Sequence, residues 1–229
     1  MKVGCFGVSI SLNNGGRSPR IIRLLFNVLA ALIGWPMLAS VILSGGASTR
    51  MGSPKALLPY QGRPFLQHLL KVTNHPKIGV RRVVLGAHVE PIAKAIPLNP
   101  QEVVINEEWE KGQLSSLQAG LRSLPPGTDG MLLCLIDHPL ISAGLVDGLI
   151  EQFYATKAPV VLPVFEGRRG HPVIFSAKVY EELERAPAEV GARGVVWAHS
   201  KEVSEYATTE EGCILNLNDP DTFDRITEA

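Results

Sequence analysis

The chain has 229 residues, with 22 Lys and Arg against 22 Asp and Glu, and therefore carries no formal net charge. Hydrophobic residues make up 45% of the sequence, which excludes global disorder, and the charge balance argues against bulk binding to nucleic acid or anionic membranes. Three widely separated cysteines, Cys5, Cys134 and Cys213, form neither a disulfide framework nor a CxxC metal site, and they favour a reducing, cytoplasmic location.

The first 36 residues differ from the rest of the chain. The uninterrupted apolar run at residues 28–35 is shorter than the about 20 residues that a transmembrane helix needs. Cleavage of a signal peptide near residues 38–40 would cut into the first predicted core strand, whereas a natural start at Met37 leaves a domain of ordinary size. We therefore expect residues 1–36 to be an extension outside the core and residues 37–229 to form one domain.

From Met37 onward, short apolar strands alternate with helical patterns. The predicted strands cover residues 37–43, 82–86, 102–106, 131–136 and 159–163. The predicted helices lie at residues 65–70, 92–96, 115–124 and 145–154. This alternation is typical of βαβ units and predicts a three-layer α/β/α sandwich with a mostly parallel, Rossmann-like sheet.

The ligand crevice of such a sheet lies beyond the carboxyl ends of its strands. Four strand ends are therefore candidates for a site: those after Leu43, after Ile105, after Ile136 and near Leu215. The run before Asp137 is the most hydrophobic of the chain, as expected for a central strand that is covered on both faces.

A glycine-rich segment follows the first strand, at residues 44–55 (SGGASTRMGSPK). Small residues allow backbone N–H groups to close on an anion, and Arg50 and Lys55 add positive charge for a polyphosphate. The segment lacks the GxxxxGK[ST] spacing of a P-loop and the GxGxxG dinucleotide fingerprint. The alternative is an ordinary glycine-rich turn that carries two solvated cations.

Asp137 ends the most hydrophobic strand, where a carboxylate is costly unless it faces the crevice or a cation. Mg²⁺ is the expected cation, since it is held by one or two carboxylates together with substrate phosphates. The alternative is that Asp137 caps the helix that follows.

These motifs resemble those of the molybdenum-cofactor nucleotidyltransferase family, the MobA-like NTP transferases. Residues 43–55 resemble its L-A-[AG]-G-x-S-x-R-M-G-x-x-K signature. Residues 106–117 and 167–173 resemble the N-x-x-W and G-x-x-G-H-P elements of the molybdopterin cytidylyltransferase branch, and residues 216–223 resemble the closing strand and its turn. The similarity spans nearly all of residues 37–229 and implies a nucleotide-diphospho-sugar-transferase-like fold.

The resemblance implies a role for each matching residue. The implied nucleotide-binding residues are Leu43, Ser44, Gly45, Gly46, Ala47, Ser48, Thr49, Arg50, Lys55, Asn106, Gly112, Ser115 and Ser116. Arg50, Lys55 and Asp137 would be catalytic, with Asp137 holding Mg²⁺ and Asn218 or Asp219 near a second metal position. Gly45 is typical of the guanylyl branch, whereas the two later elements favour the cytidylyl branch.

Several residues have two open interpretations. His171, together with Arg168 and Arg169, would bind the acceptor, or His171-Pro172 would merely turn the chain into the next strand. Ser115 and Ser116 would bond the base or ribose, or cap the helix after Gly112. The remaining polar and aromatic candidates are expected at surface, helix or packing positions: His68, His75, His88, His199, Trp109 and Trp197.

The predicted activity is transfer of CMP from CTP to molybdopterin with release of pyrophosphate. The alternative enzymes use GTP or transfer a nucleotide to another phosphorylated small molecule, and the non-enzymatic alternative is a molybdopterin carrier. An NAD(P)-dependent oxidoreductase would need a dinucleotide fingerprint that the sequence lacks. The expected partners are CTP or GTP, molybdopterin and a molybdoenzyme that receives the cofactor, with no nucleic acid and no membrane.

Overall fold

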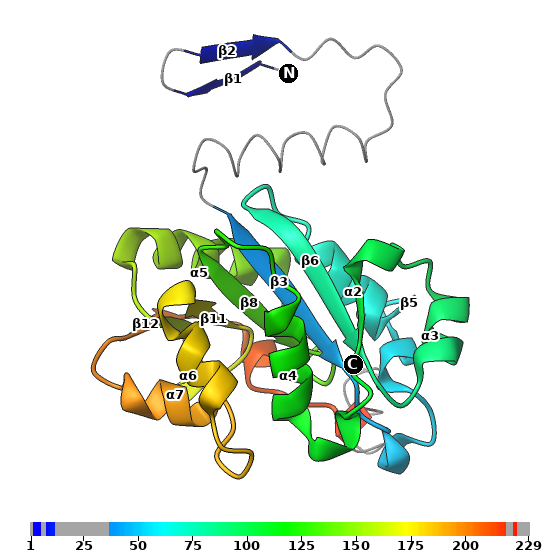
Figure 1. The fold of residues 1–229 in the computed structure, drawn as a ribbon. Helices are drawn as coiled ribbons and strands as arrows, with labels where there is room; N and C mark the ends of the chain where they lie inside the picture. The colour runs from blue at the N-terminus through cyan, green and yellow to red at the C-terminus, as the bar shows by residue number, and fades with distance from the viewer. Residues whose placement is uncertain (1, 6–7, 12–36, 219–221, 224–229) are drawn as a thin grey trace. The chain divides into compact units, whose positions relative to one another are not determined.

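The computed structural model describes residues 2–5, 8–11, 37–218 and 222–223 (Figure 1). The chain divides into two compact units, Met1–Trp35 and Pro36–Ala229. In the first unit, β1 (Lys2–Cys5) and β2 (Val8–Ser11) form an antiparallel hairpin that the sequence analysis did not predict. The apolar run at residues 28–35 lies outside the described residues, and no described helix has the length and apolar character needed to cross a membrane.

The second unit contains an eight-stranded sheet in which seven strands follow the order β10-β9-β11-β8-β3-β6-β7 and β12 pairs with β9. Its strands are β3 (Leu38–Ser44), β6 (Ile78–Leu85), β7 (Val103–Ile105), β8 (Gly130–Leu135), β9 (Val160–Phe165), β10 (Arg168–Arg169), β11 (Val173–Ser176) and β12 (Val203–Ala207). The β8, β3, β6 and β7 strands run parallel, as do β9 and β12, whereas β11 is antiparallel to both of its neighbours. A separate short hairpin pairs β4 (Pro59–Tyr60) with β5 (Arg63–Pro64).

The centre of the sheet is built from strands that are apolar along their whole length. All seven residues of β3 and all six of β8 are buried. Consecutive residues of β3 face opposite core layers: Ile42 belongs to one buried cluster, and Val41 and Leu43 belong to the other. Unbroken apolar runs are therefore explained by helices on both faces of the sheet.

Helices cover both faces of the sheet (Figure 1). The cluster on one face includes α2 (Phe65–Val72), α3 (Val89–Ala95) and α5 (Ala143–Thr156). The cluster on the other face includes α4 (Gln113–Arg122), α6 (Tyr180–Arg185) and α7 (Arg193–Ala198). This arrangement confirms the predicted three-layer α/β/α sandwich with a mostly parallel sheet.

Within the described residues 214–218, the expected closing strand near Leu215 does not form. After the 3₁₀ helix η6 (Glu211–Cys213), the chain reaches Asn218 without joining a sheet. The N–H of Leu217 donates to the carbonyl of Asp137 at 2.7 Å, which brings this segment to the end of β8. The segment therefore lies beside the carboxyl edge of the sheet as an irregular strap.

We propose that residues 37–229 form the folding unit and that residues 1–36 are dispensable for its stability. Pro36–Ala229 forms a compact unit by itself, and the N–H of Met37 donates to the Asp129 carboxylate. A chain that begins at Met37 would place its α-ammonium group at this carboxylate. We expect the shortened chain to keep the melting temperature and cooperative unfolding of the full chain, measured by circular dichroism; loss of cooperative unfolding would contradict the proposal.

Candidate active site

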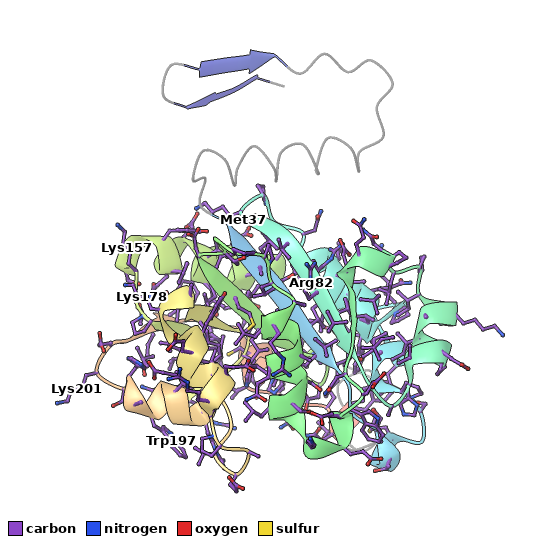
Figure 2. The ribbon with its side chains drawn as sticks, viewed as in Figure 1. Met37, Arg82, Lys157, Lys178, Trp197 and Lys201 are labelled. Carbon is purple, nitrogen blue, oxygen red and sulfur yellow. The ribbon has the colours of Figure 1, made fainter. Side chains whose placement is uncertain are left out.

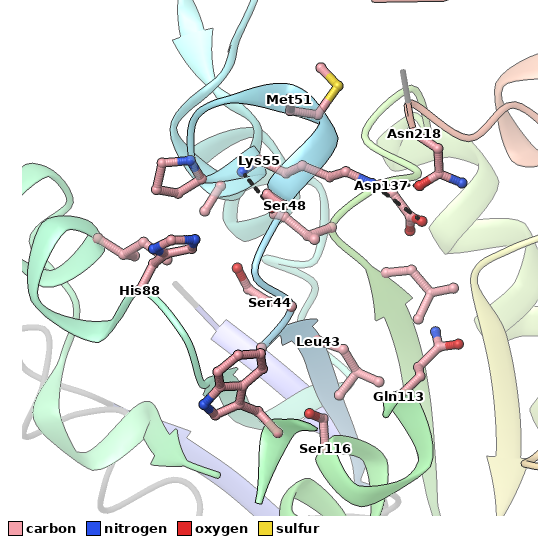
Figure 3. A pocket seen from close by; sticks show the side chains of 18 of the residues that line it. Leu43, Ser44, Ser48, Met51, Lys55, His88, Gln113, Ser116, Asp137 and Asn218 are labelled. Atoms are coloured by element: carbon pink, nitrogen blue, oxygen red, sulfur yellow. Dashed lines mark hydrogen bonds and ion pairs between the residues drawn. The ribbon is translucent and has the colours of Figure 1, made fainter. Parts of the chain in front are cut away.

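A cavity of about 330 Å³ opens at the carboxyl ends of β3, β6 and β8 (Figure 3). It brings together segments that are far apart in the sequence: the glycine-rich loop after β3, the start of α3, the start of α4 and the end of β8. The wall contains many of the expected residues: Leu43, Ser44, Gly45, Gly46, Ser48, Thr49, Lys55, Gly112, Ser116, Asp137 and Asn218. The predicted edge of the sheet therefore carries the cavity.

The glycine-rich loop is held by its carbonyl groups. The carbonyl of Gly45 accepts a hydrogen bond from the N–H of Ala87 at 3.0 Å, and that of Ala47 lies 2.8 Å from Nε2 of His88. Because the N–H of a trans peptide points opposite to its C=O, the N–H groups of Gly46 and Ser48 face the other side of the loop. Both residues line the cavity, so these N–H groups are suited to bind an anion there.

The end of β6 approaches this loop so closely that only glycine fits at position 86. A Cβ atom on Gly86 would lie 2.5 Å from the carbonyl oxygen of Gly45 and 2.5 Å from Cβ of Trp109. A Cβ atom on Gly45 would similarly lie 2.7 Å from Oγ of Ser116. The two glycines therefore set how tightly the loop, Trp109 and α4 pack around the cavity.

Lys55 connects the loop to the two oxygen-bearing side chains on the far wall. Its Nζ donates to Oδ1 of Asn218 and lies 3.9 Å from Oδ2 of Asp137 (Figure 3). The Lys55 side chain is 13% exposed and that of Asp137 is 25% exposed, so both charges are partly shielded from water. The N–H of Lys55 also donates to Oγ of Ser48 at 3.2 Å, which fixes the lysine relative to the loop.

The structure excludes a helix-capping role for Asp137. Helix α5 begins at Ala143, and its N-cap is Ser142, whose Oγ accepts from the N–H of Leu145 at 3.0 Å. Asp137 instead lines the cavity beside Lys55. Its backbone is held in place, because its carbonyl accepts from Leu217 and the N–H of Ile136 donates to the carbonyl of Leu43.

The donor set at this wall fits Mg²⁺ only in combination with substrate. Asp137 and Asn218 offer a carboxylate and an amide oxygen, and the described residues contain no group of three or more His, Cys, Asp or Glu side chains suited to a metal. Mg²⁺ is typically bound by one or two protein carboxylates, with phosphates and water completing its octahedron. Asp219 and the side chain of Arg50 lie outside the described part of the chain.

Asn106 and Ser115 lie behind the cavity wall and brace it. Nδ2 of Asn106 donates to Oγ of Ser115 at 2.9 Å and to Oγ of Ser116 at 3.0 Å, and its Oδ1 accepts from the N–H of Glu108. Oγ of Ser115 also donates toward the carbonyl of Gly112 at 2.8 Å, so Ser115 does not cap α4, whose N-cap Gly112 has no side-chain capping hydrogen bond. Of the two serines, only Ser116 is in the wall.

The three residues expected to bind an acceptor do not line this cavity. Arg168 and Arg169 lie exposed on β10, and Nη2 of Arg169 is 2.7 Å from Oε1 of Glu205. His171 packs against His138, with ring centroids 4.9 Å apart, and its N–H donates to the carbonyl of Cys213. The peptide before Pro172 leads directly into β11, as the structural interpretation of this motif expected.

The His138–His171 pair is held in its neutral form. Burial lowers the pKa of His171 to about 3, with a further contribution from His138. Burial also lowers the pKa of His138, against the opposing effect of the Asp137 carboxylate. Protonation of either ring is therefore unfavourable in the folded state.

His88 was expected at a surface or helix position, yet it lines the cavity and holds the loop. Since a carbonyl oxygen only accepts, Nε2 of His88 must carry the proton in its contact with Ala47. The available signal was its place three residues after β6, at the same sheet edge as the other strand ends. Trp109, expected to be a packing residue, also reaches the cavity wall.

We predict that His88→Phe weakens anion binding in this cavity. The substitution keeps an aromatic ring but removes the donor to Ala47, and one hydrogen bond is worth ~1 kcal/mol, or about fivefold in affinity. Isothermal titration with inorganic pyrophosphate measures the effect. His68→Phe is the matched control, because His68 contacts the Ile141 carbonyl at 3.0 Å and does not line the cavity; equal losses in both variants would contradict the role of His88.

We predict that His171→Gln makes stability less dependent on pH in the acidic range. The unfolded chain protonates His171 near the ordinary histidine pKa of 6.5 and the folded chain only near 3, so the free energy of unfolding falls as pH is lowered through this window. The free energy of unfolding, measured by urea titration at several pH values between pH 4 and pH 6, should change less steeply with pH in the variant. An unchanged pH dependence would contradict the buried neutral ring.

His199→Gln is the control of opposite sign. A hydrogen bond to Glu182 raises the pKa of His199, so its contribution to stability is complete below the ordinary pKa and is lost as pH rises through the folded value. Removal of the His199 ring should therefore leave the pH dependence of the free energy of unfolding unchanged between pH 4 and pH 6.

Comparison with known proteins gives a family match over most of residues 37–229. Residues 40–203 match the MobA-like NTP transferase domain. A curated relative, "nicotine blue oxidoreductase" of Paenarthrobacter nicotinovorans, is 30% identical over 153 residues, which cover 62% of this chain and 72% of the relative. The "probable molybdenum cofactor guanylyltransferase" of Mycobacterium ulcerans is 28% identical over 191 residues, covering 79% of this chain and 89% of the relative.

Solved structures agree with the fold. Rv0371c from Mycobacterium tuberculosis H37Rv superposes with a TM-score of 0.75 at 27% identity, covering 84% of this chain and 99% of that chain. A structure of the same protein in complex with manganese has a TM-score of 0.69. More distant solved structures share the architecture and confirm the predicted nucleotide-diphospho-sugar-transferase-like fold.

Proposed function

The chain belongs to the MobA-like NTP transferase family and is a nucleotidyltransferase, and on that premise we propose that it transfers a nucleoside monophosphate to molybdopterin. The observation that carries the proposal is the convergence of Lys55, Asp137 and the glycine-rich loop on one cavity. A cation, a partly shielded carboxylate and backbone donors are the groups that bind a metal-complexed triphosphate.

The proposed reaction needs no general base. The terminal phosphate of the acceptor is ionised near neutral pH, and its oxygen attacks the α-phosphorus of the triphosphate. One P–O bond forms, the bond between the α- and β-phosphates breaks, and pyrophosphate leaves with the electron pair. The protein contributes by positioning the two reactants and by neutralising charge.

The residues of the cavity have distinct parts in this scheme. The N–H groups of Gly46 and Ser48 orient the phosphates, and the Lys55 ammonium group balances the charge that develops on pyrophosphate. Arg50 is proposed to share this task. Asp137, with Asn218 or Asp219, would hold Mg²⁺, which supplies charge neutralisation and fixes the phosphate geometry when bound; the manganese complex of Rv0371c supports a divalent cation.

GTP is the first candidate for the nucleotide donor. The names of curated relatives support it, because several are molybdenum cofactor guanylyltransferases, and the glycine at position 45 is typical of that branch. CTP is the second candidate, favoured by the element that contains Asn106 and Ser116 and by the one that contains His171. A Cβ atom at position 45 would contact Oγ of Ser116, so the glycine that favours GTP and the serine of an element that favours CTP lie in the same part of the cavity wall.

Molybdopterin is proposed as acceptor on the names of relatives, with another phosphorylated small molecule as its alternative. Arg168, Arg169 and His171 remain proposed acceptor contacts, although they lie outside the cavity. A molybdopterin carrier would bind ligand without turnover. One relative is named an oxidoreductase. An NAD(P)-dependent oxidoreductase would bind NADH, but this chain lacks the GxGxxG dinucleotide-binding fingerprint.

We predict that pyrophosphate release requires a specific nucleoside triphosphate together with a phosphorylated acceptor. Each of ATP, CTP, GTP and UTP is paired with molybdopterin, with sugar phosphates and with no acceptor. GTP with molybdopterin is expected to give the fastest release, and faster release with CTP would select the cytidylyl branch. Lys55→Ala and Asp137→Ala should each lower the rate about 10²–10³-fold, as expected for the loss of one preorganised electrostatic contact.

The matched control is Lys71→Ala, which removes an exposed lysine from α2, outside the cavity. Its rate should equal that of the unmodified chain. Near-normal turnover by both site variants would remove the proposed site, and ligand binding without turnover by the unmodified chain would favour the carrier.

A further inference from the structure

A second cavity, of about 440 Å³, lies at the amino ends of β9 and β12. Strand β9 is antiparallel to β11, which is antiparallel to β8, so β9 runs parallel to β8; β12 runs parallel to β9. The second cavity is lined by residues just before β9 and at the start of β12, whereas Asp137 follows the end of β8. The two cavities are therefore separate sites at opposite ends of the strands.

Four segments meet around the second cavity: the end of α5, the turn into β9, the 3₁₀ helix η5 (Ala177–Val179) and the turn between α7 and β12. Ala158, Pro159 and Val179 are buried and provide an apolar floor. Ser204 is fixed at the wall, because its Oγ accepts from Nε2 of Gln152 at 2.9 Å. The volume lies within the range of small-molecule sites.

Three lysines from three of these segments line this cavity: Lys157, Lys178 and Lys201. Figure 2 shows them on the same flank of the domain. Among the described residues, none of the three ammonium groups has a carboxylate within ion-pair distance. Like charges gathered without a counter-ion repel one another, and an anion in the cavity would remove that repulsion.

Negative groups near the cavity only partly offset these lysines. Glu202 is in the wall, but its carboxylate contacts Nδ1 of His199 at 3.3 Å. Hydrogen bonding to Glu182 raises the pKa of His199, which favours its charged form next to both carboxylates. The charge of the lining therefore remains positive.

Helix capping accounts for part of the lysine cluster. Nζ of Lys178 donates to the carbonyl of Lys157 at 3.2 Å, at the carboxyl end of α5, where cations are favourable. This contact does not involve Lys201, which enters from the turn before β12. Lys157 has a φ of 53° at the C-cap of α5, a conformation that favours glycine. The chain therefore carries a charged side chain at a position where glycine is the usual residue.

We propose that this second cavity binds a compact anion that bears a diphosphate or polyphosphate group. The ammonium groups of Lys157, Lys178 and Lys201 would donate to its phosphate oxygens, and the apolar floor would accept a small organic portion. The source of the phosphate group is either free pyrophosphate or a phosphorylated metabolite. The proposal does not depend on which nucleotide or acceptor the catalytic cavity uses.

The test is an amide NMR titration of the full chain with inorganic pyrophosphate in a Lys55→Ala background, which weakens competing binding at the catalytic cavity. We expect saturable shifts at the amides of Val179 and Ser204. Combined Lys157→Gln, Lys178→Gln and Lys201→Gln substitutions should weaken this binding at least tenfold. The three lysines are exposed, and the melting temperature of the variant checks that it is folded.

The matched control is Lys94→Gln, which removes an exposed lysine from α3, outside the second cavity, and should leave the titration unchanged. Equal weakening in the control and in the triple variant, or shifts confined to residues 44–55, would overturn the proposal. A parallel titration with methyl diphosphate distinguishes the sources, because tighter binding than pyrophosphate identifies an organic diphosphate. Tighter binding of a hexaglutamate peptide than of either phosphate would overturn it in favour of an acidic protein segment.

Discussion

The interaction on which the catalytic cavity depends is the contact of the Lys55 ammonium group with Asn218 and Asp137. It ties together three segments: the loop after β3, the end of β8 and the strap that follows η6. A lysine that is only 13% exposed needs such oxygen partners, because a shielded charge without them is costly. The same oxygens that stabilise the lysine are those that suit a hard cation, so substrate binding must redistribute these contacts rather than create the site anew.

The loop geometry follows from a second constraint, the close approach of β6 to the glycine-rich turn. Gly86 permits this approach, and the Ala87 and His88 donors then hold the carbonyls of Gly45 and Ala47. The donors facing the cavity are therefore set by contacts on the far side of the loop. A phosphate site of this kind is preorganised by residues that need not touch the phosphate, which is consistent with catalysis by positioning and charge.

The sequence predicts the parts of the structure that follow from local pattern. Unbroken apolar runs predicted β3 and β8, and the parallel-sheet rule brought Lys55 and Asp137 to one edge. Pattern did not predict β12, whose residues are only partly buried at the margin of the sheet, or the strap that replaces the expected closing strand. The sequence pattern also did not predict that His88 lies in the cavity wall or that Asn106 lies behind that wall. Both positions depend on the side of a loop against which a neighbouring segment packs.

The distribution of charge is a further property that composition conceals. The chain has equal numbers of acidic and basic residues, yet the lining of the second cavity has three lysines and one glutamate, whereas the first cavity places Lys55 beside Asp137. Elsewhere the described charges are often paired on the surface, as in Arg122–Glu184 and Arg169–Glu205. Exposed pairs of this kind contribute little to stability and little to the long-range field. The excess of lysines at the second cavity therefore favours anions there, and a net charge of zero excludes a uniformly basic surface without excluding a local anion site.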